Sequence, residues 1–181
     1  MNPCQQLDDI LPRLSGLVAS LDESDLDAPT PCSDFAVRDV LAHMIGGASM
    51  FSAAFRGQSA EATPPSADLV AAFPGAMTEL RAAVGSPGAL ERTISAPFGE
   101  VPGEAFARFV ALDGLVHGWD IATALNRAYE PPSEVVAAVG AFARQAISEQ
   151  MRDGTTFAAA VDPGPGSSPL IQLVAFTGRQ P

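Results

Sequence analysis

The residues best suited to chemistry form a polar line in the segment FVALDGLVHGWDIATALN, residues 109–126. Asp113, His117 and Asp120 recur there at spacings of four and three residues. Residues four apart on a helix lie one turn above each other, so the Asp113 carboxylate and the His117 imidazole can reach a common point. That geometry suits a metal ion. Beside the polar line runs an apolar stripe that predicts a buried face: Leu112, Leu115, Val116, Trp119 and Ala122.

The only other histidine, His43, stands at the edge of the apolar face of an earlier predicted helix. His43, Asp113 and His117 would make a three-ligand set with room for water or a substrate atom, the pattern of catalytic zinc sites. The spacing alone favours a structural role for these residues over a metal site. A buried polar side chain needs only a hydrogen-bond partner, which does not have to be a metal ion. Asp120 competes with Asp113 for the third place, either as a direct ligand or as a carboxylate that orients one.

Cys32 and Trp119 are candidate neighbours of such a site. Cys32 precedes a predicted helix N-terminus, where a thiolate is favoured, but no base is evident in the sequence and a structural role is expected. Trp119 is expected in the core, with the wall of a pocket as the alternative. Cys4 and Cys32 are expected to be free, reduced thiols.

Composition excludes several classes of function. The net charge of −11 opposes binding to nucleic acid. All ten basic residues are arginine, which excludes a Schiff-base lysine and a lysine-containing phosphate loop. Two histidines and two cysteines cannot supply a paired-cysteine zinc finger or a three-histidine site. No apolar run approaches the roughly 18 residues that a membrane span needs, and the start lacks a secretory signal. We therefore expect a cytoplasmic protein with no membrane partner and one domain, residues 1–181.

Helical periodicity predicts the first half of the fold. A first helix covers residues 7–21, and Pro12 should make its regular part start near Leu11 or bend it. A second helix should be capped by Ser33 or Asp34 and end at Gly57. The third should be capped by Ser66, kink or split around Pro74, and stop at Gly85.

In the second half of the chain, the helical spacing of apolar residues is first interrupted. Residues 92–106, RTISAPFGEVPGEAF, predict a short hairpin or an irregular arm. Helices are then expected over residues 104–126 and 133–151, followed by a short C-terminal helix capped by Ser167 or Ser168. Four principal helices with a long connection between the third and the fourth indicate an all-α, antiparallel four-helix bundle with this arm and the extra C-terminal helix.

Three motifs resemble the DinB-like superfamily: TPCSDFAVRDVLAHMIGG (30–47), DGLVHGWDIATA (113–124) and the ending AFTGRQP. The branch they resemble is the actinobacterial group related to the N-terminal domain of mycothiol-dependent maleylpyruvate isomerase. The resemblance implies a four-helix bundle that binds a divalent metal through a histidine on the second helix and an acid or histidine four residues before another histidine. Those positions match His43, Asp113 and His117, although the isomerase branch is expected to have glutamate at Asp113. The family acid after the last histidine matches Asp120.

The function that this resemblance implies is a metal-dependent transferase or isomerase that uses a small thiol such as mycothiol. The metal is expected to be zinc, with nickel and manganese as alternatives. A bound divalent ion would depress the pKa of the thiol, which would then attack an electrophile as a thiolate. A homodimer is also implied. Two alternatives stay open: a non-catalytic metal-binding or ligand-sensing bundle, and a bundle whose histidines are purely structural.

Overall fold

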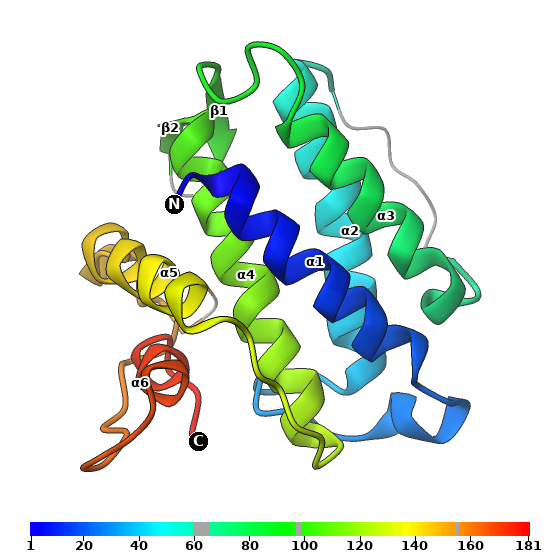
Figure 1. The fold of residues 1–181 in the computed structure, drawn as a ribbon, viewed down its shortest axis with the longest axis vertical. Helices are drawn as coiled ribbons and strands as arrows, with labels where there is room; N and C mark the ends of the chain where they lie inside the picture. The colour runs from blue at the N-terminus through cyan, green and yellow to red at the C-terminus, as the bar shows by residue number, and fades with distance from the viewer. Residues whose placement is uncertain (60–65, 97–98, 155) are drawn as a thin grey trace.

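A computed structural model describes residues 1–59, 66–96, 99–154 and 156–181, and over these ranges the chain is mostly helical (Figure 1). An antiparallel hairpin of β1 (Thr93–Ala96) and β2 (Gly99–Pro102) is the one sheet in this part of the chain. Two 3₁₀ turns are η1 (Glu23–Asp27) and η2 (Glu149–Met151). The all-α prediction is confirmed in this broad sense. The α-helices within the described ranges are α1 (Pro3–Ala19), α2 (Val37–Arg56), α3 (Leu69–Val84), α4 (Gly103–Ala124), α5 (Ser133–Ala146) and α6 (Pro169–Phe176).

The four long helices of the first two thirds of the chain lie against one another. Helix α1 contacts α3 and α4, and α2 contacts the same two helices. Helices α5 and α6 pack together at one side of α4, and the C-terminus lies beside α6 on that side (Figure 1). Helix α4 therefore has α2 as one neighbour and the C-terminal elements as another, and its side chains can meet residues from both.

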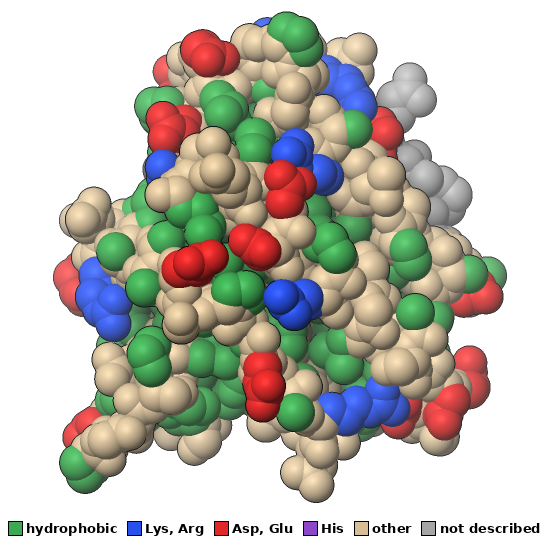
Figure 2. All heavy atoms as spheres, viewed as in Figure 1, with side chains coloured by type: hydrophobic (Ala, Val, Ile, Leu, Met, Phe, Trp, Pro, Cys, Tyr) green, Lys and Arg blue, Asp and Glu red, His purple; other side chains and the backbone are tan. Residues whose placement is uncertain are grey.

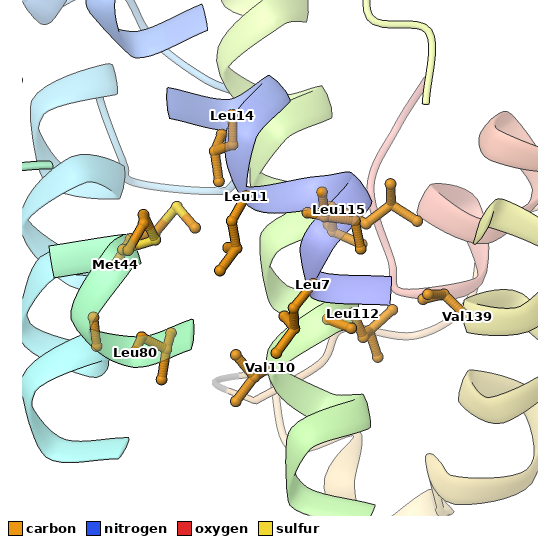
Figure 3. Close-up of a cluster of buried hydrophobic side chains, with 14 of the residues drawn as sticks. Leu7, Leu11, Leu14, Met44, Leu80, Val110, Leu112, Leu115 and Val139 are labelled. Atoms are coloured by element: carbon orange, nitrogen blue, oxygen red, sulfur yellow. The ribbon is translucent and has the colours of Figure 1, made fainter. Parts of the chain in front are cut away.

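Apolar faces of these helices form one continuous core (Figure 3). Leu7 of α1 lies beside Leu112 of α4, and Leu11 and Leu14 of α1 extend into the same cluster on the side of Met44 of α2. Each fully buried leucine contributes about 1.5–3 kcal/mol through removal of its surface from water. The predicted apolar stripe of α4 is buried throughout, including Trp119 at 7% exposure, which confirms the core role of that residue. This burial fixes the rotation of α4 and with it the direction of the polar line.

The start predicted for the first helix near Leu11 is wrong. Helix α1 begins at Pro3, where the Asn2 side chain and Gln5 form a reciprocal capping box, and it continues through Pro12 to Ala19. Two buried turns of α1 before Pro12 supply packing that offsets the lost backbone hydrogen bond.

The cap predicted for the second helix is also wrong. Helix α2 has Ala36 as its N-cap, and its backbone N–H donates to the Asp39 carboxylate at 2.9 Å. Ser33 and Asp34 belong instead to a turn closed by Thr30, whose hydroxyl donates to the carbonyl oxygen of Phe35 at 2.8 Å. The end at Gly57 is confirmed.

Other boundaries differ by a few residues. Helix α3 is capped by Asp68 and not by Ser66, and it contains Pro74 without splitting. The helix expected to reach residue 151 ends at Ala146, after which η2 follows. The hairpin and the cap of α6 by Ser168 are confirmed. None of the helices in the described ranges is long and apolar enough to cross a membrane.

Candidate metal site

The structure brings together the three side chains that the sequence predicts as metal ligands. His43 comes from α2, and Asp113 and His117 come from successive turns of α4. The Nε2 atoms of His43 and His117 lie 3.5 and 3.4 Å from the same oxygen, Oδ1 of Asp113. The two imidazole rings stand 5.1 Å apart between centroids, and one donor atom from each residue lies within 4.8 Å of the others.

These distances fit a shared cation better than direct hydrogen bonds. Good N–H···O hydrogen bonds measure about 2.7–3.2 Å, which is shorter than either contact. Ligand bonds of about 2.0–2.2 Å in a tetrahedral zinc site place neighbouring ligand atoms about 3.3–3.5 Å apart. The donors are two imidazole nitrogens and one carboxylate oxygen, a mixed set that zinc accepts. The residues present therefore fit a divalent transition-metal ion.

The cluster is closed on one side and accessible on the other. The His117 side chain is 7% exposed, whereas those of His43 and Asp113 are 45% and 34% exposed. Figure 2 shows the face that carries α1, where acidic and basic side chains alternate and neither histidine is visible. The accessible side of the cluster thus opens on a different face, and a small ligand could approach from there.

A second polar layer lies behind His117. Its Nδ1 lies 3.0 Å from Oδ2 of Asp120, a fully buried carboxylate. Arg179 donates to both oxygens of Asp120, from Nε at 3.3 Å and from a terminal nitrogen at 3.0 Å. A carboxylate facing Nδ1 keeps a proton on that nitrogen, so loss of the second proton of His117 would free Nε2, the nitrogen that faces Asp113 and His43. Of the two roles open to Asp120 from sequence, the geometry favours that of orienting His117.

Arg179 is the site residue that the sequence reasoning missed. It follows α6 in the ending AFTGRQP, which carried part of the family resemblance but to which no role was assigned. Gly178 has φ +97, a left-handed conformation that redirects the chain after the helix. A Cβ on Gly178 would lie 2.6 Å from the Cβ of Ala158, so only glycine fits this turn without displacement. The chain reversal brings the Arg179 guanidinium to Asp120.

The site shifts the pKa values of its own residues. Burial disfavours the charged form of His117, but the negative charge and polar contact of Asp113 and the hydrogen bond to Asp120 outweigh it and raise its pKa to about 9. For Asp113, burial acts to raise the pKa, and the two histidines more than offset it, so the pKa lies well below its usual range. In the metal-free protein the cluster therefore holds a proton that a metal would have to displace.

Cys32 lies beside this second layer. Its sulfur, a ring nitrogen of His117 and an oxygen of Asp120 lie within 4.8 Å of one another. Arg179 already neutralises Asp120, so this second group is poorly suited to a cation. Burial raises the pKa of the Cys32 thiol, which keeps it protonated and supports a structural role. Cys4 and Cys32 are both free, as predicted.

Comparison with known proteins identifies relatives and a family. Two uncharacterised proteins of Mycobacterium tuberculosis, from strains CDC 1551 and H37Rv, are each 32% identical over 168 residues, which cover 91% of this chain and 91% of each relative. No solved structure matches the chain. Residues 7–122, which contain all three candidate ligands, match the family described as the mycothiol maleylpyruvate isomerase N-terminal domain. The chain therefore belongs to this family, an actinobacterial group within the DinB-like superfamily.

Proposed function

We propose that this protein binds a divalent metal, zinc foremost, through His43, Asp113 and His117, and uses it in a transferase or isomerase reaction of a small thiol such as mycothiol. The observation that carries the proposal is the pair of 3.4 and 3.5 Å contacts that direct two imidazole nitrogens at one carboxylate oxygen. The description of the family, which names mycothiol and an isomerase, supports the thiol and the reaction class. We also interpret α1–α4 as the DinB-like four-helix bundle.

Each residue of the site would have its own role. His43 and His117 would bind the ion through Nε2, and Asp113 would complete the set and offset part of its charge. Asp120, held by Arg179, would keep His117 in the tautomer and orientation that ligation requires. A bound divalent ion supplies one chemical effect, a lower pKa for a thiol that reaches its accessible side. Cys32, whose own pKa is raised, would stay protonated and would not compete with that thiol.

Metal analysis of the purified protein tests the site. We expect one equivalent of zinc, nickel or manganese in the wild type and its loss in His43→Ala and in His117→Ala. Glu134→Ala is the matched control, because it removes an exposed carboxylate from α5 and should keep the metal. Wild-type protein that binds no transition metal would leave the two histidines with a structural role.

Thiol binding tests the reaction class separately. Calorimetric titration of the metal-loaded protein with mycothiol should show binding that disappears in His43→Ala. Conjugation of electrophiles should depend on the added thiol, with bacillithiol as the comparison. A metal-loaded protein that binds neither thiol would instead be a metal-binding or ligand-sensing bundle without catalysis.

A further inference from the structure

A pocket of about 650 Å³ lies between α4 and α5. Its apolar lining comes chiefly from Ala105 and Phe109 of α4, Phe142 and Ala146 of α5, and Met151. The rings of Phe109 and Phe142 meet edge to face with centroids 4.9 Å apart. Its volume lies within the range of about 300–1,000 Å³ that is usual for small-molecule sites, and aromatic walls favour flat apolar ligands.

The pocket lies on the same side of α4 as the candidate ligands. Phe109 precedes Asp113 by four residues, and Ala105 precedes Phe109 by four. Four residues make slightly more than one helical turn and rise about 6 Å, so these side chains form one row along the helix. All three are partly exposed, whereas most of α4 is buried. Asp113 thus lies about one helical turn beyond Phe109, the lining residue nearest to it in the sequence.

The pocket has no cationic group. None of the ten arginines lines it, and the residues outside the described ranges include no arginine or lysine. Arg152, which directly follows η2, donates instead to the carbonyl oxygens of Ala158 and Phe176. Arg179 is held by Asp120. Among the described lining residues the one ionisable side chain is Asp153, whose carboxylate accepts from the backbone N–H of Thr156 at 2.7 Å and adds negative charge at the pocket.

We propose that this pocket binds the uncharged, aromatic carbon skeleton of the second substrate, and that it discriminates against substrates with two carboxylates. The link to a reaction depends on the proposed function, since the thiol would attack from the adjacent metal site. Binding itself requires only the pocket. Leaving an anion unpaired in an apolar pocket beside a carboxylate costs affinity, whereas an uncharged ring loses little on desolvation.

Fluorescence titration with N-phenyl-1-naphthylamine, an uncharged aromatic probe, tests the pocket in the full-length protein. Saturable binding is expected in the wild type and should weaken at least tenfold in Ala146→Trp, which fills the pocket. Ala137→Trp is the matched control, because it places the same side chain on an exposed position of α5 and should bind like the wild type. Equal binding by Ala146→Trp and the wild type would overturn the assignment of the pocket.

Competition experiments test the charge preference. The uncharged 2-naphthol should displace the probe at concentrations at least tenfold below those of 2,6-naphthalenedicarboxylate, and equal potency would refute the discrimination against dianions. His43→Ala separates this inference from the proposed function. Probe binding that survives in that variant while metal is lost supports an independent pocket. A metal-loaded wild type that fails to bind the probe would refute the pocket and leave the metal site intact.

Discussion

At the scale of single residues, the buried Asp120 carboxylate holds the site in place. It accepts from His117 on one side and from both nitrogens of an Arg179 fork on the other. A buried charge is costly unless it is paired, so removing one partner leaves an uncompensated carboxylate. The pairing also joins the C-terminal tail to the helix that carries two of the three candidate ligands.

Arg179→Ala should therefore destabilise the protein by about 3 kcal/mol, a typical cost for breaking a buried ion pair. It should also weaken metal binding, because Asp120 would no longer be held in the position that fixes the tautomer of His117. Urea denaturation measures the first effect and competition with a metal chelator the second. Arg38→Ala provides the control, since its partner Asp27 is largely exposed and the loss should stay below about 1 kcal/mol. Equal losses in both variants would contradict a special role for the buried pair.

The raised pKa of His117 predicts a pH dependence of stability in the metal-free protein. The folded-state pKa of about 9 exceeds the ordinary value of 6.5, so the folded state binds the proton more tightly than the unfolded chain. This stabilisation is complete below pH 6.5 and is lost as the pH rises toward 9. Asp113 acts in the opposite direction, because its lowered pKa stabilises the fold above the ordinary value of 3.8 and the effect fades in acid.

In the presence of a metal chelator, the free energy of unfolding of the wild type should thus fall between pH 6.5 and 9 by an amount on the order of a few kcal/mol. His117→Gln cannot titrate and should flatten that slope. Denaturant titrations of the wild type and of His117→Gln at several pH values measure the slope. An identical slope in the variant would place the responsible group elsewhere.

At the scale of elements, α4 could be predicted closely, but the N-cap of α2 and the position of the tail after α6 could not. Its apolar stripe and polar line are both explicit in the spacing of residues, because each repeats at helical periodicity. The cap at Ala36 was missed because Asp39 reaches back from inside the helix, while Ser33 and Asp34 offered stronger local signals. The bond from Arg179 to Asp120 joins positions 59 apart, and no local pattern reveals such a contact.

Gly178 makes that long-range contact possible, and its substitution tests the turn after α6. Gly178→Ala must adopt φ +97 with a methyl group 2.6 Å from the Cβ of Ala158. We expect a loss of more than about 2 kcal/mol, composed of backbone strain and displacement of the tail. Gly164→Ala is the matched control. Gly164 also has a positive φ, +80, but no atom lies within 4 Å of where its Cβ would be. The control should lose only about 1–2 kcal/mol, the strain alone.

Chemical denaturation with the metal-loaded and the chelated protein distinguishes the two parts of that effect. A displaced tail should also reduce metal affinity in Gly178→Ala and leave it unchanged in Gly164→Ala. If the two alanine variants matched in both measurements, close packing against Ala158 would not be what places Arg179.

At the scale of the whole molecule, the candidate ion would connect two helices that are far apart in the sequence. His43 and Asp113 are separated by 70 positions, and they belong to α2 and α4. A ligand that binds only the folded state stabilises it by mass action, by about 2.7 kcal/mol at a hundredfold excess over its dissociation constant. The connection between α2 and α4 should therefore appear as a gain in global stability.

Thermal unfolding of the chelated protein with added zinc should show a higher midpoint than without it, and His43→Ala should abolish the shift. Magnesium is the informative control, because the net charge of −11 attracts any divalent cation, whereas two imidazoles favour zinc over an ion that prefers oxygen. A shift of equal size with magnesium would assign the stabilisation to general screening of the acidic surface. A zinc-specific shift that survives in His43→Ala would place the ion elsewhere, because α2 would then contribute no ligand.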